Sequence, residues 1–183
     1  MIYFFLANGF EETEAISPLD LLRRAGLNVK TVAVGTKNGE LTVTGAHSIK
    51  LVADMHESEI DPDSADGVIL PGGLPGADNL YASEYVASAL DSAYKRGAVI
   101  GAICAAPYIL GKRGFLDGKR AVCFPGYETD LVGATVTDAP AVIDGNIITG
   151  KAMGAAIPFG LALVSVLCGK ETADRIASAI HSK

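Results

Sequence analysis

The residue in this sequence that is best placed to do chemistry is a cysteine at a predicted strand-to-helix junction. Residues 99–103 form an apolar run typical of a buried strand, and residues 105–110 begin a helix of small and apolar side chains. Cys104 therefore lies at a sharp turn, with its sulfur at the carboxyl edge of the sheet, as in a nucleophile elbow. The partial positive charge of the helix N-terminus beneath it predicts a lowered thiol pKa. The alternative is a small buried hydrophobic residue.

A carboxyl group can reach this sulfur from the first predicted strand. Glu11, Glu12 and Glu14 follow that strand, and a semi-buried carboxyl there has a raised pKa. It can donate a hydrogen bond to a thiolate or transfer a proton. Residue types alone do not decide which glutamate does so. The other two are interpreted as serving the helix dipole or solubility.

Two glycines follow another predicted strand at residues 68–70. The N–H groups of Gly73 and Ala105 can together form an oxyanion hole for a reacting carbonyl. A glycine-rich turn without a further role is the alternative for Gly72-Gly73. The segment is neither a Walker A loop nor a dinucleotide-binding fingerprint. The sequence therefore predicts no cofactor.

No histidine stands near Cys104 in the sequence. His47 falls in a predicted hairpin, His56 in an acidic loop expected to be exposed, and His181 three residues from the end. A hydrolase that uses a cysteine nucleophile normally needs a histidine base. Only the fold can show whether one of these side chains approaches the sulfur. Cys123 and Cys168 lie in apolar runs and are expected to be core or edge residues.

Bulk properties exclude several classes of protein. The 183 residues suit one domain, residues 1–183, and the net charge of −6 without a basic cluster argues against nucleic acid or an anionic membrane as partner. Three cysteines without a C-x-x-C pair predict neither a disulfide framework nor a metal site. The N-terminal apolar run is too short for a signal peptide or a spanning helix. We expect a soluble protein of a reducing compartment, the cytoplasm.

Strands and helices alternate along the chain, which predicts an α/β fold with a mainly parallel sheet. The loops after residues 6 and 70 and the turn at Cys104 then meet at one edge of the sheet, where such folds bind ligands. A small hairpin is expected off the main sheet, and a second one at Asp144-Gly145. At Pro18 we expect a kink, or a break between a short acidic turn and a second helix. The predicted strands are residues 2–6, 28–34, 68–70, 98–103, 121–124, 135–137, 141–143 and 146–149, with hairpin strands 41–44 and 47–52. The predicted helices are residues 11–26, 83–97, 105–111, 157–167 and 170–183, and residues 54–66 form a surface loop with a helical turn.

Taken together, these segments resemble the ThiJ/PfpI superfamily, in the branch of the Parkinsonism-associated protein deglycase and its bacterial relatives. The resemblance runs nearly end to end, in one order and spacing. It rests on residues 7–15 (ANGFEETEA), 70–73 (LPGG) with Gly76-Ala77, 102–107 (AICAAP), and 159–163 (FGLAL) to Gly169-Lys170.

The resemblance implies a flavodoxin-like three-layer sandwich with helices on both faces of the sheet, and a homodimer. Cys104 matches the family's reactive cysteine, and Glu14 matches the buried, protonated glutamate beside it. Gly73 and Ala105 match the backbone donors, and His47 a hairpin position that reaches the partner subunit's site. No metal or cofactor is implied.

One position departs from the family pattern. Several relatives carry His-Pro after the strand that follows the elbow, whereas this chain has Phe124-Pro125. Some bacterial relatives in the same branch also have Phe-Pro. The departure leaves open what replaces the histidine, and it disfavours a cysteine peptidase or amidase.

Two hypotheses of different classes follow from the resemblance. The first is an enzyme that detoxifies reactive carbonyl compounds. It would act on a small aldehyde or a glycated substrate, as a glyoxalase III-like enzyme or a deglycase. The second is a redox sensor or chaperone that responds to oxidation of Cys104.

Overall fold

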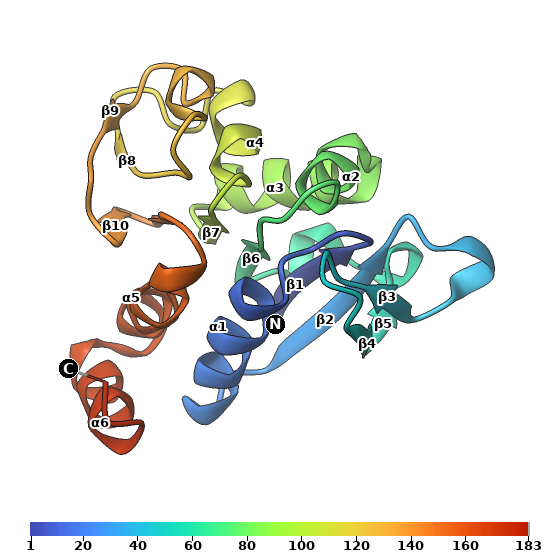
Figure 1. Cartoon of the computed structure of the whole chain (residues 1–183), viewed down its shortest axis with the longest axis horizontal. Coiled ribbons are helices and arrows are strands. Elements are labelled where there is room, and N and C mark those ends of the chain that lie inside the picture. The colour runs from blue at the N-terminus through green and yellow to red at the C-terminus, as the bar shows by residue number, and fades with distance from the viewer. Residues whose placement is uncertain (183) are drawn as a thin grey trace.

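The computed structural model describes residues 1–182 and is built around one seven-stranded sheet (Figure 1). The strand order is β10-β11-β7-β6-β1-β2-β5. All neighbours pair in parallel except β10 and β11, which form the antiparallel hairpin predicted at Asp144-Gly145. The predicted mainly parallel α/β architecture is confirmed.

The strands of the main sheet are short, and the central ones are buried on both faces. They are β1 (Ile2–Ala7), β2 (Val29–Val34), β5 (Met55–His56), β6 (Gly67–Leu70), β7 (Val99–Ile103), β10 (Ala141–Asp144) and β11 (Ile147–Gly150). Two further pairs lie off the sheet: the predicted hairpin of β3 (Thr42–Thr44) and β4 (Lys50–Val52), and the parallel pair of β8 (Arg120–Ala121) and β9 (Thr135–Val136).

Within the described residues 1–182, six α-helices cover the two faces of the sheet. They are α1 (Glu12–Arg24), α2 (Gly76–Ala82), α3 (Glu84–Arg96), α4 (Pro107–Lys112), α5 (Ala156–Cys168) and α6 (Lys170–Ala179). Helices α1, α5 and α6 pack on one face, and α2, α3 and α4 on the other (Figure 1). Short 3₁₀ turns include η2 (Glu57–Glu59) and η4 (Glu128–Asp130).

Strand β1 contributes to both apolar cores, which is why its sequence is continuously apolar. Tyr3 and Phe5 belong to the cluster beneath α2, α3 and α4, whereas Phe4 and Leu6 belong to the cluster beneath α1, α5 and α6. All four side chains are almost completely buried. Successive side chains of a strand point to opposite faces, so one run of large apolar residues fills two layers.

The expected break at Pro18 does not occur. Helix α1 is a single helix with Pro18 inside it and buried. Helix α5 packs closely here: a Cβ on Gly160 would lie 3.0 Å from Pro18 Cα. The tight α1–α5 contact outweighs the one backbone hydrogen bond that proline removes.

Several element boundaries differ from the sequence prediction. Helix α2 was not predicted, and residues 54–66 contain the edge strand β5 besides their 3₁₀ turns. The strand predicted at residues 121–124 ends at Ala121, because the Val122 N–H bonds to Thr149 Oγ1 and the chain then turns away. Helix α4 begins at Pro107, a residue favoured in the first helical turn. The predicted C-terminal helix ends at Ala179, and Lys183 lies outside the described residues.

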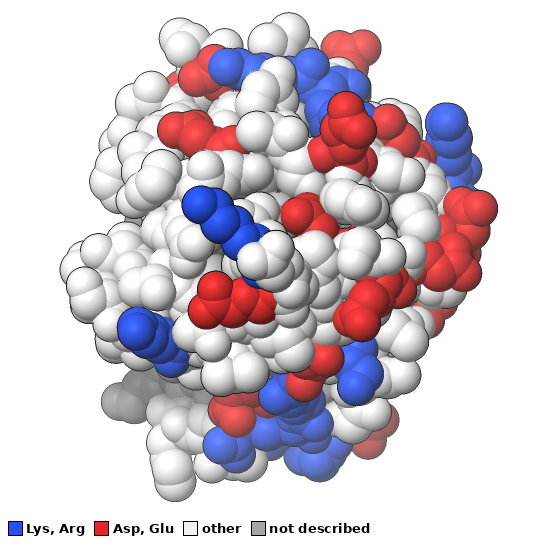
Figure 2. All heavy atoms as spheres, turned by 90° about the vertical axis from the view of Figure 1, so that its right-hand side faces the viewer, with Lys and Arg blue, Asp and Glu red and all other residues white. Residues whose placement is uncertain are grey.

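Acidic and basic side chains are interspersed on the face shown in Figure 2, and that face carries no continuous basic area. Among residues 1–182, no helix has the length and apolar character needed to cross a membrane.

Candidate active site

Cys104 lies directly after β7, at a backbone position that L-residues rarely adopt. Its φ is +66°, in the left-handed region, and such strain is characteristic of functional turns. The Cys104 N–H donates to the Gly150 carbonyl of β11, and the Cys104 carbonyl accepts from the Phe124 N–H at 2.8 Å. These two backbone bonds fix the turn, and the side chain is left half-buried. The predicted elbow geometry is confirmed.

Glu14 is the glutamate that reaches the sulfur. Its side chain is 1% exposed, and its Oε2 accepts from the Gly72 N–H at 3.1 Å. The Glu14 carboxyl lies beside the Cys104 side chain, and each group shifts the pKa of the other. Glu11 is instead the N-cap of α1, where its carboxylate accepts from the Glu14 N–H. This bond fixes the backbone at Glu14.

Gly72 and Gly73 lie against the other two site segments. A Cβ on Gly72 would be 2.6 Å from Cys104 Cβ and 2.6 Å from Glu14 Oε2, so a larger residue cannot fit. Gly73 has φ +87° and lies close to Glu11 N. The Gly73 and Ala105 N–H groups lie near the Cys104 sulfur and act to lower its pKa, against the effects of burial and of Glu14. The structure thus brings the four residues Cys104, Glu14, Gly73 and Ala105 together.

The Cys104–Glu14 pair titrates as a unit. Burial raises the pKa of Glu14 to about 7. Burial first, and then the neighbouring Glu14 carboxylate, raise the pKa of Cys104 to about 12. Between these two steps the pair holds one proton and one negative charge. The pKa of Cys104 is the higher of the two, so the shared proton lies mainly on the sulfur, and its transfer to Glu14 gives a thiolate near the Gly73 and Ala105 N–H groups.

The lowered thiol pKa predicted from the helix N-terminus is therefore wrong for a sulfur that faces an ionised Glu14. Desolvation and the carboxylate charge outweigh the Gly73 and Ala105 donors. Helix α4 is also only six residues long and starts three residues after Cys104, so its dipole is weak there. A thiolate at this site depends on the protonation of Glu14.

His47 is held by Glu12 in the same chain. Its ring atom Nδ1 lies 2.9 Å from Glu12 Oε2, its backbone N–H donates to Glu12 Oε1, and its side chain is 71% exposed. The hydrogen bond to Glu12 raises the pKa of His47. Glu12 lies in the first turn of α1, where the helix dipole favours a carboxylate, as expected. Because it is 5% exposed it does not serve solubility, and it also anchors the β3–β4 turn. No sequence pattern indicated that contact.

The other histidines are accounted for elsewhere. His56 caps η2 through its Nδ1, and its Nε2 is buried, so the expected full exposure is wrong. His181 is exposed after α6. Cys123 is buried and Cys168 half-buried, as predicted. Phe124 is 44% exposed and lies on the loop that is bonded to the Cys104 carbonyl.

One group of side chains in the part of the chain that is described has the spacing of metal ligands. Glu11, Glu12 and His47 each offer one ligand atom, and these atoms lie within 4.8 Å of one another. All three already have protein partners: Glu11 accepts from Glu14, and Glu12 accepts from the β3–β4 turn and from His47. The hydrogen bonds explain this arrangement without an ion.

A strained cysteine, a buried glutamate and converging backbone donors at the carboxyl edge of a parallel sheet define a class of flavodoxin-like proteins with a reactive cysteine. The sequence comparison identifies the family: the model of the DJ-1/PfpI family matches residues 1–166, and the chain belongs to this family. The resemblance to the ThiJ/PfpI superfamily and the flavodoxin-like fold are thereby confirmed.

Individual relatives agree along almost the whole chain. Protein dj-1beta of Drosophila melanogaster is 38% identical over 96% of this chain and 93% of its own length. A protein named a deglycase from Pyrococcus horikoshii is 30% identical over 82% of this chain and 89% of its own. The structure of oxidized DJ-1 from Toxoplasma gondii superposes with a TM-score of 0.92 at 31% identity, covering 98% of this chain and 97% of that one.

Proposed function

We propose that this protein is an enzyme that converts small reactive aldehydes, such as methylglyoxal or glyoxal, into hydroxy acids, or removes them from glycated amines. The observation that carries the proposal is the pairing of Cys104 with the buried Glu14 carboxyl beside Gly72, with the Gly73 and Ala105 N–H groups near the sulfur. The deglycase name of the Pyrococcus horikoshii relative supports the same class of substrate.

The chemistry begins with the proton on Glu14 and a thiolate on Cys104. The sulfur attacks the aldehyde carbon of methylglyoxal, and the carbonyl oxygen, negatively charged as the C–S bond forms, takes the proton of Glu14 to give a hemithioacetal and leave Glu14 as a carboxylate. The Gly73 and Ala105 N–H groups stabilise the negative charge on that oxygen. The bond formed is C–S, and the electron pair of the C=O bond moves to oxygen.

Glu14 then acts as base and acid in turn. As a carboxylate it removes the hydrogen from the former aldehyde carbon, which gives an enediolate. The hydroxyl proton then moves from the oxygen of this carbon to the oxygen of the adjacent carbon, and Glu14 returns its proton to the adjacent carbon. The product on the sulfur is a thioester of lactate, which water hydrolyses to lactate and the free thiol. No redox partner is required, because one carbon is oxidised as its neighbour is reduced. A pKa of about 7 suits a group that must both accept and donate a proton.

A methylglyoxal-to-lactate assay tests the proposal. Wild-type protein should form lactate, while Cys104→Ala and Glu14→Gln should each reduce the rate by at least roughly a hundredfold. Cys168→Ala is the matched control, because this half-buried cysteine is the last residue of α5, and none of the four site residues belongs to α5 or α6. Lactate formation by Cys104→Ala at the wild-type rate would refute the mechanism.

Redox sensing is the second candidate, and the same pair supports it. A protonated Glu14 beside the sulfur can donate a hydrogen bond to a sulfinate formed from Cys104, stabilising that oxidation state. Cys123 is 4% exposed, which limits the access of an oxidant to its sulfur, whereas Cys104 is only half-buried. Mass spectrometry after mild peroxide treatment should therefore find Cys104 modified first. Earlier oxidation of Cys123 or Cys168 would argue against a sensor.

We also propose a homodimer in the cytoplasm. Large apolar side chains are exposed on α1 and the β3–β4 hairpin, where Ile16, Ile49 and Val52 are 42%, 53% and 70% exposed. A second copy that covers them would bury these side chains, with His47 on the same hairpin. Free cysteines fit a reducing compartment. Sedimentation of wild type and Val52→Asp would test the dimer, and a monomeric wild type would contradict it.

A further inference from the structure

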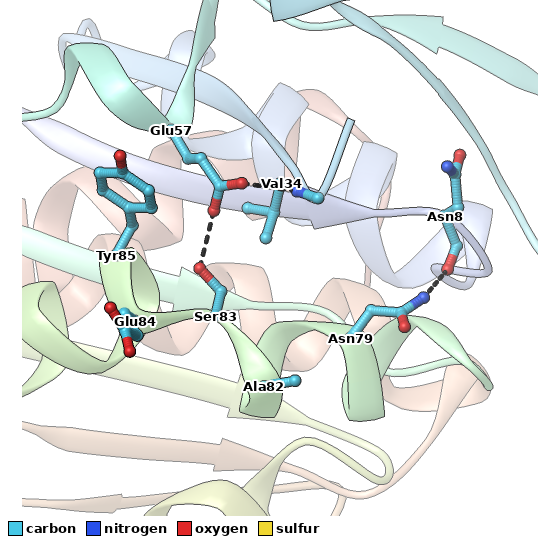
Figure 3. Close-up of a pocket in the computed structure, with 9 residues that line it drawn as sticks. Asn8, Val34, Glu57, Asn79, Ala82, Ser83, Glu84 and Tyr85 are labelled. Atoms are coloured by element: carbon cyan, nitrogen blue, oxygen red, sulfur yellow. Dashed lines mark hydrogen bonds between the residues drawn. The ribbon is translucent and has the colours of Figure 1, made fainter. Parts of the chain in front are cut away.

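A hollow of about 410 Å³ lies outside the Cys104 site, at the carboxyl end of β2 (Figure 3). Its walls come from the loop after β1, the end of β2, the turn η2 and the junction between α2 and α3. Ligand sites of parallel α/β sheets lie at this edge. The proposed carbonyl chemistry makes no use of this hollow.

Glu57 is buried beside the hollow. It is 8% exposed, its Oε1 accepts from the Gly35 N–H at 2.7 Å, and its Oε2 accepts from the Ser83 hydroxyl at 2.7 Å (Figure 3). Within residues 1–182 it forms no ion pair with a basic side chain, and its charge is offset in part by these two donors and by the N-terminus of α3. Each carboxylate oxygen can accept two hydrogen bonds, so each retains one acceptor position.

A second carboxylate and an aromatic ring complete the lining. Glu84 lies in the first turn of α3, and the ring of the adjacent Tyr85 is 45% exposed and lies near the Glu57 carboxyl in Figure 3. No lysine, arginine or histidine is among the residues that line the hollow. An anion would therefore meet two carboxylates without a counter-charge, whereas a cation would meet two carboxylates and the negative face of a tyrosine ring.

A purely structural role explains only part of this arrangement. The hydrogen bonds of Glu57 tie the end of β2 to the cap of α3, and that tie needs neither Glu84 nor the exposed ring of Tyr85. We propose that the hollow binds a small organic cation with N–H donors, of the guanidinium or alkylammonium type. Its donors bond to Glu57 and Glu84, and its face lies on the ring of Tyr85. This binding does not depend on Cys104 or on carbonyl turnover.

Titration of the ¹⁵N-labelled full chain with methylguanidinium chloride at constant ionic strength tests this site. The reporter is the Gly35 amide, because it donates directly to Glu57. N-methylurea, which has nearly the same shape and no charge, is the matched ligand control. The expected result is a saturable shift of the Gly35 resonance with methylguanidinium and none with N-methylurea.

Two surface variants separate binding from folding. Glu84→Gln and Tyr85→Leu should each weaken methylguanidinium binding roughly two- to fivefold, the size of one exposed cation contact. Tyr81→Leu, an equally exposed tyrosine of α2 outside the hollow, should leave the affinity unchanged. An absent shift, an equal response to N-methylurea, or wild-type affinity in both variants would overturn the proposal.

Discussion

Replacing Gly72 by alanine tests the closest approach in the Cys104 site. The new Cβ would lie 2.6 Å from Cys104 Cβ and from Glu14 Oε2, about 1 Å inside normal contact distance. Moving the Glu14 carboxyl away also weakens its bond to the Gly72 N–H. Overpacking of this kind costs about 1–3 kcal/mol and the lost hydrogen bond about 1 kcal/mol. We expect the free energy of unfolding to fall by about 2–4 kcal/mol.

Two glycine controls separate local from general effects. A Cβ on Gly101 would lie 2.8 Å from Leu163 Cδ2, so Gly101→Ala overpacks the core beneath α5 rather than the site. It should destabilise the protein by about 1–3 kcal/mol while leaving the alkylation of Cys104 unchanged. A Cβ on Gly154 would meet no atom within 4 Å, and this residue is not among the glycines with positive φ. Gly154→Ala should be within about 0.5 kcal/mol of wild type.

The assay combines urea unfolding with the rate at which iodoacetamide alkylates Cys104, followed by mass spectrometry. Gly72→Ala should lower stability and change the alkylation rate several-fold, because both partners of the pair must move. Stability within about 0.5 kcal/mol of wild type, together with an unchanged alkylation rate, would refute the geometry described for Gly72, Glu14 and Cys104.

Three further outcomes are expected. Because the folded state raises the pKa of Glu14 from 4.5 to about 7, this group favours folding at low pH and loses that effect as pH rises through this window, by roughly 3 kcal/mol. The unfolding free energy of Glu14→Gln should not show that decline with pH. If the unfolding free energies of wild type and Glu14→Gln changed in parallel with pH, the raised pKa of Glu14 would be contradicted. Asp54 Oδ2 accepts from the Thr31 N–H, the Thr31 hydroxyl and Arg23, which lower its pKa, so Asp54→Asn should lose about 1–2 kcal/mol at pH 7. That difference should shrink as pH falls through the folded pKa of Asp54; a constant difference in urea unfolding would exclude the charged contacts as its cause. The Glu12 carboxylate accepts hydrogen bonds from N–H groups of the β3–β4 turn, so Glu12→Gln should speed proteolysis within that turn. An unchanged rate of cleavage would show that the turn is stable without these hydrogen bonds.

The sequence was sufficient for the parts of the fold that depend on local pattern. The apolar runs of β1, β6 and β7 predicted a parallel sheet, and the turn after β7 predicted the strained backbone of Cys104. Pro18 failed as a helix breaker because the deciding interaction, its contact with α5, involves residues far along the chain. The two-residue strand β5 is too short for any periodic pattern to reveal.

In the site, too, local pattern predicted some features, whereas others depend on residues that only folding brings together. The cysteine could be found from its junction, but choosing among three glutamates needed the resemblance to a family, which pointed to Glu14. The structure explains the choice: Glu11 caps α1, Glu12 anchors the hairpin, and only Glu14 is directed into the fold. The direction of the Cys104 pKa shift could not be predicted, because it depends on burial and on the charge of a residue brought close by folding.

The two edge strands of the main sheet are short. At one edge β5 has two residues, and at the other β10 has four, preceded by Pro140. A strand from another molecule could form only a few backbone hydrogen bonds at either edge. Extension of the sheet from one molecule to the next is therefore weakly favoured, so association between copies must depend on side-chain surfaces such as the exposed apolar residues of α1 and the β3–β4 hairpin.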